Sequence, residues 1–238
     1  MNTIDFKHFP LKPGERILDI GCGEGRHALT AYTLEEVESI GVDLSFDDVM
    51  TALDRFKDFQ EPDNDSKRLF VSLADARHLP FAAGSFDKVI CSEVLEHIED
   101  HDVVLGEINR VLKVGGMLAI SVPRFGPEWV CWQLSSDYHA EEGGHIRIFN
   151  AGHLRRDVEK TGMIHFRRHW AHALHVPYWW LKCVFWGRSE EPWIIRTYHR
   201  FLVWDLMKKP FITQFLEKLL DPIMGKSVVM YFVKGLHG

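Results

Sequence analysis

The nine residues Ile17-Leu18-Asp19-Ile20-Gly21-Cys22-Gly23-Glu24-Gly25 decide the fold class of this chain. Their apolar start predicts a buried strand, which runs directly into a G-x-G-x-G turn that opens a helix. Glycine has no Cβ, so the backbone of this turn can bend tightly and approach a ligand closely. The free N–H groups at the start of the helix favour a carboxylate or a phosphate nearby. Taken alone, the pattern also fits other nucleotide-binding folds or a purely structural turn.

Two common nucleotide-binding motifs do not match this turn. The dinucleotide fingerprint G-x-G-x-x-G needs a third glycine, and Arg26 occupies that position. No GK[ST] follows the turn, which excludes a P-loop. The sequence therefore argues against NAD, FAD and nucleoside triphosphates as ligands of this turn.

The first half of the chain alternates strand-like and helix-like segments. This alternation predicts right-handed βαβ crossovers and a parallel, doubly wound α/β sheet. The expected helices are Arg26–Leu34, a segment capped by Ser45 that runs through Phe59, and Asp102–Leu112. The expected strands are Arg16–Ile20, Ser39–Val42, Arg68–Leu73, Lys88–Cys91 and Met117–Val122, the last one following a break at Gly115-Gly116.

Polar residues follow the expected strands, where a doubly wound sheet binds its ligands. Asp43 ends the second strand and is placed to accept both hydroxyls of a ribose, while Asp75 follows the third. Ser92 and Glu93 follow the fourth. Each acid alone could be an ordinary exposed loop residue, but together they favour a nucleoside-sized ligand.

The second half of the chain is rich in aromatic residues. After Pro123 we expect a long connection (Arg124–Phe149), a helix (Ala151–Thr161), a strand (Ile164–Arg168) and, after the aromatic region, a final strand, Ser227–Lys234. A helix is expected over Ile194–Met207. The predicted organisation is an α/β core over residues 1–170, an aromatic-rich helical insertion over 171–226, and the last strand of the core within 227–238.

Five segments resemble the ordered motifs of class I S-adenosylmethionine (SAM)-dependent methyltransferases: ILDIGCGEGRHA, GVDLS, ADARHLPF, SFDKVICSEVLEHIED and LKVGGMLAISVP. The resemblance covers roughly Lys12 to Pro123 and is greatest to the small-molecule, ubiquinone-biosynthesis-like branch called methyltransferase type 11. It implies a Rossmann-like seven-stranded sheet of order 3-2-1-4-5-7-6 with strand seven antiparallel. It also implies methyl transfer from SAM to a small-molecule acceptor.

The resemblance assigns cofactor-binding roles to particular residues. Those at the methionine end of SAM would be Asp19, Gly21, Cys22, Gly23 and Gly25. Those around the ribose and the adenine would be Asp43, Leu44, Asp75 and Ala76, with Ser92 and Glu93 on the floor beside the sulfonium.

Histidine suits a general base near neutral pH, and the chain offers several candidates. His145 lies in Gly143-Gly144-His145, and His139 lies in the same connection next to Tyr138, which is also a catalytic candidate. His97 follows the fourth strand. Structural or substrate-packing roles remain open for each of them. No metal is expected, because His165, His169, His172 and His175 have no carboxylates or cysteines at ligand spacing.

Composition narrows the remaining possibilities. A formal net charge of -6 gives no overall attraction for nucleic acid, and four scattered cysteines without a CxxC pair favour a reduced, cytoplasmic protein. No run reaches the ~18 apolar residues of a membrane span, and the N-terminus does not resemble a signal peptide. The aromatic and basic residues of 176–188 suit a lid for an apolar or amphipathic acceptor (isoprenoid, lipid or polyketide-like) that meets a membrane surface, or else the core of a helical subdomain or a homodimer contact. A regulatory or scaffold protein that binds SAM without catalysis is the alternative function.

Overall fold

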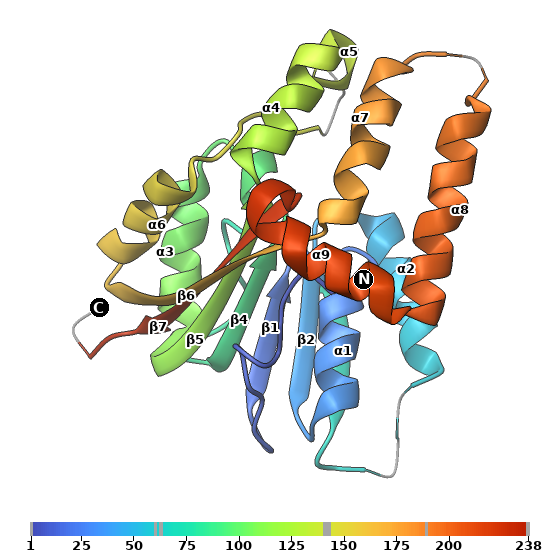
Figure 1. Ribbon diagram of the computed structural model, residues 1–238. Helices are drawn as coiled ribbons and strands as arrows, with labels where there is room; N and C mark the ends of the chain where they lie inside the picture. The colour runs from blue at the N-terminus through green and yellow to red at the C-terminus, as the bar shows by residue number, and fades with distance from the viewer. Residues whose placement is uncertain (1, 60, 62–63, 140–143, 189, 237–238) are drawn as a thin grey trace.

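A seven-stranded sheet of order β3-β2-β1-β4-β5-β7-β6 forms the centre of the computed structural model (Figure 1). The structure describes residues 2–59, 61, 64–139, 144–188 and 190–236, apart from the side chain of His139. β7 pairs antiparallel with β5 and β6, and the pairings among β1 to β5 are parallel. The predicted order and the antiparallel seventh strand are therefore confirmed. The strands are β1 (Arg16–Ile20), β2 (Glu38–Asp43), β3 (Arg68–Leu73), β4 (Phe86–Ser92), β5 (Leu112–Pro123), β6 (Met163–Ala171) and β7 (Ser227–Lys234).

Helices cover both faces of the sheet, because alternate residues of each buried strand point to opposite sides. Leu18 and Ile20 of β1 belong to the core cluster shared with α3 (His101–Val111) and α6 (Ala151–Lys160). Ile17 instead belongs to a cluster with α1 (Arg26–Leu34) and the N-terminal segment. α2 (Phe46–Lys57) packs beside α1 and β3, and Ser45 caps it by accepting the backbone N–H of Asp48, as predicted.

The predicted break at Gly115-Gly116 is an irregularity inside β5. The β4–β5 register shifts between Phe86 and Lys88, where the paired residues change from Leu112 to Met117. Gly115 has a φ of +77°, and a Cβ at Gly116 would lie 2.8 Å from the carbonyl oxygen of Lys113. Glycine permits this detour, and the strand continues past it.

The connection expected from Arg124 to Phe149 contains two helices, α4 (Phe125–Leu134) and α5 (Ser136–His139). The sequence does not indicate α4, because the apolar side chains of this helix surround it instead of forming one stripe. Among the described residues, the short helix η2 (Ala173–His175) and three α-helices lie between β6 and β7, namely α7 (Val176–Val184), α8 (Trp193–Lys208) and α9 (Phe211–Met224). α7 stands beside α4, above the strand ends (Figure 1). In the described ranges, no helix has the length and apolarity needed to cross a bilayer.

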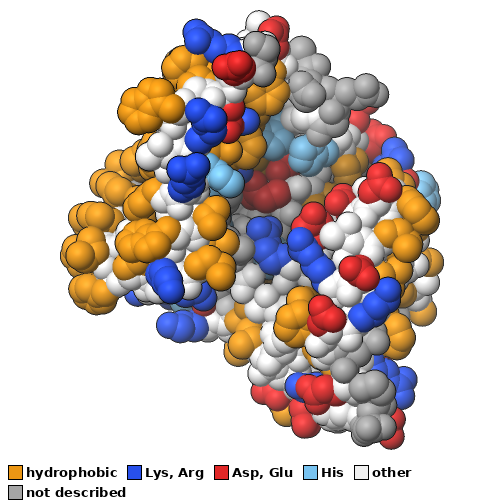
Figure 2. Space-filling model, turned by 90° about the vertical axis from the view of Figure 1, so that its right-hand side faces the viewer, with side chains coloured by type: hydrophobic (Ala, Val, Ile, Leu, Met, Phe, Trp, Pro, Cys, Tyr) orange, Lys and Arg blue, Asp and Glu red, His pale blue; other side chains and the backbone are white. Residues whose placement is uncertain are grey.

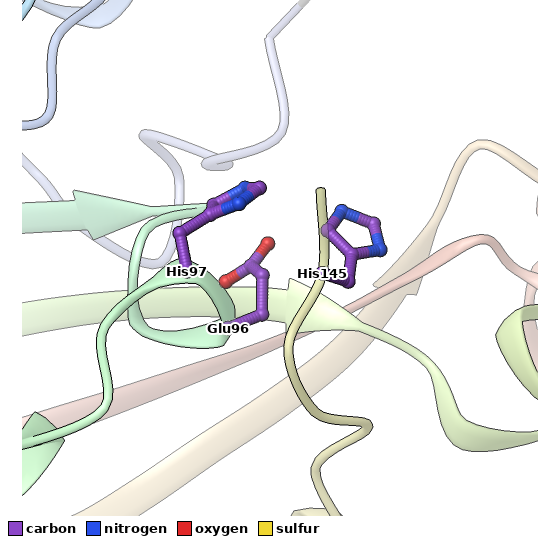
Figure 3. Close-up of side chains that lie close together, drawn as sticks. All are labelled: Glu96, His97 and His145. Carbon is purple, nitrogen blue, oxygen red and sulfur yellow. The ribbon is translucent and has the colours of Figure 1, made fainter. Parts of the chain in front are cut away.

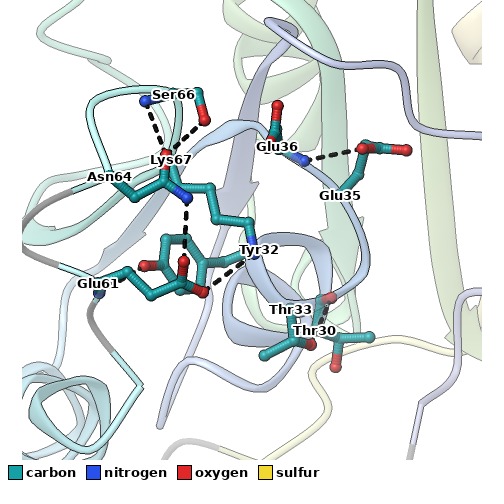
Figure 4. Close-up of polar contacts among 9 residues, drawn as sticks. All are labelled: Thr30, Tyr32, Thr33, Glu35, Glu36, Glu61, Asn64, Ser66 and Lys67. Carbon is teal, nitrogen blue, oxygen red and sulfur yellow. Dashed lines mark hydrogen bonds and ion pairs between the residues drawn. The ribbon is translucent and has the colours of Figure 1, made fainter.

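The polar loop between α2 and β3 is anchored on α1 by one aromatic side chain (Figure 4). The Tyr32 hydroxyl accepts the backbone N–H of Glu61 at 2.9 Å, and Lys67 lies over the Tyr32 ring. Glu61 in turn accepts hydrogen bonds from Asn64 and Lys67. Because Tyr32 is itself buried, these contacts fix the described residues of the loop beside α1, ahead of the amino end of β3.

Candidate active site

A cavity of about 590 Å³ opens at the carboxyl ends of β1 to β4, where a doubly wound sheet binds its ligand. Its volume is within the range of small-molecule and cofactor sites, about 300–1,000 Å³. Figure 2 shows a hollow in the surface with acidic and histidine side chains at its floor. The predicted site residues that line the cavity are Gly21, Gly23, Asp43, Leu44, Asp75, Ala76, Glu93 and His97.

The glycine turn adopts a backbone that side chains would prevent. Gly21, Gly23 and Gly25 have φ angles of +62°, +52° and +80°. A Cβ at Gly21 would lie 2.3 Å from the Val94 side chain, and one at Gly25 would lie 2.5 Å from the Phe56 ring. A Cβ at Gly23 would meet no described atom within 4 Å, so this glycine leaves its backbone open to the cavity. The turn therefore has the close-approach geometry that the sequence predicted.

Asp43 at the end of β2 is fixed by the glycine turn. Its carboxylate accepts the backbone N–H of Gly23 at 2.7 Å and that of Ser45 at 2.9 Å. An ionised carboxylate can accept about four hydrogen bonds, so two positions remain for a ligand in the cavity. The turn and this carboxylate face one nucleoside-sized space.

The far end of the cavity combines an acid, a cation and an apolar surface. Asp75 forms a two-pronged ion pair with Arg77, which holds the pKa of Asp75 below its ordinary value. Leu44, 72% exposed, and Ala76 supply apolar contacts against which an aromatic base could stack. Asp75, which the family resemblance places near the adenine, therefore already has a charged partner.

Four predicted cofactor residues lie behind the cavity wall: Asp19, Cys22, Gly25 and Ser92. Asp19 accepts the backbone N–H of Ala28 with one oxygen, whereas its Oδ1 has no hydrogen-bond partner within the described part of the chain. Burial raises the pKa of Asp19 to about 7. Ser92 hydrogen-bonds Ser121, whose hydroxyl donates to Glu93 at 2.9 Å. These residues support the wall instead of forming its surface.

A buried carboxylate brings together two of the predicted catalytic residues. Glu128 of α4 is only 3% exposed, and its Oε1 accepts Nδ1 of His145 at 2.6 Å and the Tyr138 hydroxyl at 3.1 Å. Trp132 donates to the same oxygen at 3.2 Å. Burial by itself would raise the pKa of Glu128, but the hydrogen bonds from His145 and Tyr138 outweigh it and lower that pKa. Glu128 is therefore ionised and orients the His145 imidazole.

His97 completes this group. Its ring centroid lies 5.0 Å from that of His145, and its Nδ1 hydrogen-bonds the carbonyl of Gly144 at 3.1 Å. Next to it on the short helix η1 (Leu95–His97), the Glu96 side chain is fully buried. Figure 3 shows the Glu96 carboxylate between the two imidazoles.

Tyr138, His145 and His97 of this group were predicted from the sequence, whereas Glu96 and Glu128 were not. Glu96 is visible in the motif Glu93-Val94-Leu95-Glu96-His97, whereas Glu128 lies in a helix that the sequence did not predict. The side chain of the fourth catalytic candidate, His139, lies outside the described residues.

The aromatic residues of 176–188 pack inward on this group. The Trp180 indole donates to the carbonyl of Pro127 in α4 at 3.1 Å. The rings of Trp186 and Trp179 lie 5.2 and 6.3 Å from that of Tyr138. The insertion therefore forms an aromatic wall, consisting of Tyr138, Trp179 and Trp186, beside His145.

The sheet order, the glycine turn and the carboxylate at the end of β2 define a class I SAM-dependent methyltransferase domain. Residues 18–120 match the model of the family described as "Methyltransferase domain". Over that part the chain is therefore a methyltransferase domain, and the recognition made from its motifs is confirmed.

Relatives with curated functions are similar over about half of the chain. The 27-O-demethylrifamycin SV methyltransferase of Amycolatopsis mediterranei is 40% identical over 111 residues, which are 47% of this chain and 39% of that protein. The sterol 24-C-methyltransferase erg6 of Schizosaccharomyces pombe is 34% identical over 139 residues, 58% of this chain and 33% of that protein. The chain thus spans less than half the length of these relatives.

Solved structures share the fold over nearly the whole chain. Phosphoethanolamine N-methyltransferase 2 of Haemonchus contortus, solved with S-adenosyl-L-methionine, has a TM-score of 0.63 at 22% identity, covering 97% of this chain and 51% of that one. The [4+2]-cyclase SpnF has a TM-score of 0.61 at 21% identity, covering 94% and 77%.

Proposed function

We propose that this protein transfers the methyl group of SAM to a small-molecule acceptor that is apolar or amphipathic. The observation that carries the proposal is that Gly21, Gly23 and Asp43 line the same cavity as Glu93 and His97. The nucleoside of the cofactor and the reacting group of the acceptor can therefore lie side by side in this cavity.

The residues of the cavity fit this cofactor. Gly23 leaves room beside the turn, Asp43 keeps two acceptor positions for the ribose hydroxyls, and Leu44 offers an apolar face for adenine. SAM supplies an activated methyl group on a sulfonium. The protein contributes orientation, which supplies about 7 kcal/mol or more in well-aligned reactions, and exclusion of water.

The acceptor proton has a candidate receiver in His145. Because Nδ1 of this imidazole donates to Glu128, its Nε2 keeps a lone pair. An oriented base of this type contributes about 10²–10⁴-fold to a rate. Tyr138, held by the same carboxylate, would position the acceptor, and His97 borders the cavity.

The aromatic wall supports an apolar acceptor. Trp179 and Trp186 stand next to Tyr138, so a hydrophobic molecule could lie along them with its reactive group toward His145. The similarity to methyltransferases acting on 27-O-demethylrifamycin SV and on sterols agrees with such an acceptor.

We assign contact with a lipid surface to α9 instead of residues 176–188. The aromatic side chains of 176–188 are half-buried, whereas α9 exposes Phe211 (82%), Ile212 (69%) and Ile223 (71%). Lys208 and Lys209 precede this apolar face, as is common in helices that lie on a bilayer. Homodimerisation and a cytoplasmic location stay predictions.

Calorimetric titration with S-adenosylhomocysteine, followed by radiolabelled methyl transfer to fractionated small-molecule extracts, tests the proposal. Binding together with labelling of an apolar fraction is the expected result. Binding without labelling of any fraction would favour the non-catalytic regulatory or scaffold role, and absence of binding would refute both.

A further inference from the structure

Three possible metal ligands from two distant segments converge beside the cavity. Glu96 and His97 lie on η1, and His145 lies before α6; one side-chain ligand atom of each lies within 4.8 Å of the others. The segments are joined by the hydrogen bond from Ile146 N to the Glu96 carbonyl, 3.0 Å, and by that from His97 to Gly144. Ligands about 2.0–2.2 Å from one ion lie at most about 4.4 Å apart, so small side-chain rotations suffice.

Glu96 is the feature that no structural role explains. Its side chain is fully buried, and neither carboxylate oxygen has a hydrogen-bond partner among the described residues. Buried carboxylates are otherwise paired with a cation or a hydrogen-bond donor, because desolvation of an unpaired charge is costly. The carboxylate points between the His97 and His145 rings (Figure 3). A cation between the two rings would give this buried carboxylate the partner that it lacks.

The surroundings of Glu96 add to the negative charge. Two further acidic residues, Glu93 and Glu128, act electrostatically on Glu96. Lys226 opposes them but makes no hydrogen bond to Glu96 in the described structure. Three carboxylates thus act on one buried position.

Both imidazoles are prepared to bind a cation. A carbonyl or a carboxylate can only accept, so Nδ1 of His97 donates to Gly144 and Nδ1 of His145 donates to Glu128. In this tautomer the lone pair of Nε2 is the one available to an ion. Metal-binding histidines characteristically donate their other nitrogen to a carbonyl or a carboxylate in this way, which orients the ring.

We infer that Glu96, His97 and His145 bind a divalent first-row transition-metal ion such as Zn²⁺, Co²⁺ or Mn²⁺. Two imidazoles and one carboxylate leave coordination positions open, as in catalytic rather than structural sites. His97 and Glu93 line the cavity, so an open position is available to a molecule inside it. The expectation of no metal was based on His165, His169, His172 and His175. Sequence spacing does not reveal that His145 lies beside His97, because the two residues are far apart in the chain.

The ion would have a defined role in the reaction, a point that rests on the proposed function. An acceptor hydroxyl bound to the ion loses its proton to solvent water more readily, because the cation stabilises the oxyanion. The oxygen then forms its bond to the methyl carbon while the C–S bond breaks, its electron pair returning to sulfur to give S-adenosylhomocysteine. His145 acts here as a ligand, so the ion replaces it as the group that activates the acceptor.

Cobalt titration of the untagged full-length protein, freed of metal with a chelator, tests the site without any activity measurement. We expect one Co²⁺ per chain, with visible absorption bands of low-symmetry coordination. Glu96→Gln and His145→Asn should each weaken binding at least ~10-fold. The matched control is Glu217→Gln, which alters a second group formed with His172 and His175.

The melting temperature provides a second readout. Added Co²⁺ should raise it for the wild type and for Glu217→Gln, but not for Glu96→Gln, which should be at least as stable as the wild type when metal-free. Absence of Co²⁺ binding to the wild type, or unchanged binding in Glu96→Gln, would overturn the site. Because neither measurement uses SAM, a failure of the proposed function would show separately, as absent binding of S-adenosylhomocysteine.

Discussion

Replacing Asp43 with asparagine tests the link between the glycine turn and the cofactor. The carboxylate already accepts two backbone N–H groups, from Gly23 and Ser45, and has two acceptor positions left for ribose hydroxyls. A hydrogen bond to a charged group contributes about 1.5–3 kcal/mol. The amide keeps one oxygen but loses the charge and turns an NH2 toward a donor. We therefore expect a loss of about 1.5–3 kcal/mol, or roughly 10- to 150-fold in the Kd of S-adenosylhomocysteine.

Calorimetry on the folded variant measures this effect, and the melting temperature without ligand reports damage to the turn itself. Asp48→Asn is the matched control, because Asp48 also lines the cavity but has its carboxylate on α2. We expect its Kd to stay within about twofold of the wild-type value, as for a surface charge. An unchanged Kd in folded Asp43→Asn would refute the assignment of Asp43 to the ribose.

Three further predictions concern Asp19, Glu128 and the exposed face of α9. Burial raises the pKa of Asp19 to about 7, so between about pH 4 and pH 7 the folded protein keeps a proton that the unfolded chain has released. The free energy of unfolding therefore falls as the pH rises from about 4 through 7. Asp19→Asn should therefore be more stable than the wild type at about pH 8, by up to roughly 4 kcal/mol, and nearly equal at about pH 4; a pH-independent difference in melting temperature would contradict this. Glu128→Gln should lower turnover about 10- to 100-fold, because the His145 imidazole loses the carboxylate that orients it, whereas cofactor affinity should not change. An equal loss of cofactor affinity would instead assign Glu128 to cofactor binding. Serine at both Phe211 and Phe215 should abolish co-sedimentation with anionic phospholipid vesicles, unlike serine at half-exposed Phe70; wild-type protein that dimerises without binding vesicles would assign α9 to a subunit contact.

Local chemistry made the α/β half of the molecule predictable. β1, α1, β3 and β7 begin and end where the sequence placed them, because each combines a clear period of apolar residues with a cap or a turn at its ends. The acid at position 43 was found for a similar reason, since the carboxyl ends of neighbouring parallel strands meet at one edge of the sheet. The Gly115-Gly116 pair was read as a break because the sequence does not reveal that β5 resumes its pairing beyond it.

What the sequence by itself determined is therefore the sheet, its order through the family motifs, and the crevice between the glycine turn and Asp43. Only the tertiary structure decided which polar groups lie together. Glu128 reaches His145 from a helix without an apolar stripe, and Glu96, beside His97 in sequence, lies near His145 across 49 residues of chain. The physical reason is that backbone periodicity acts over a few residues, whereas a buried charge is governed by desolvation and by partners that the fold supplies from elsewhere.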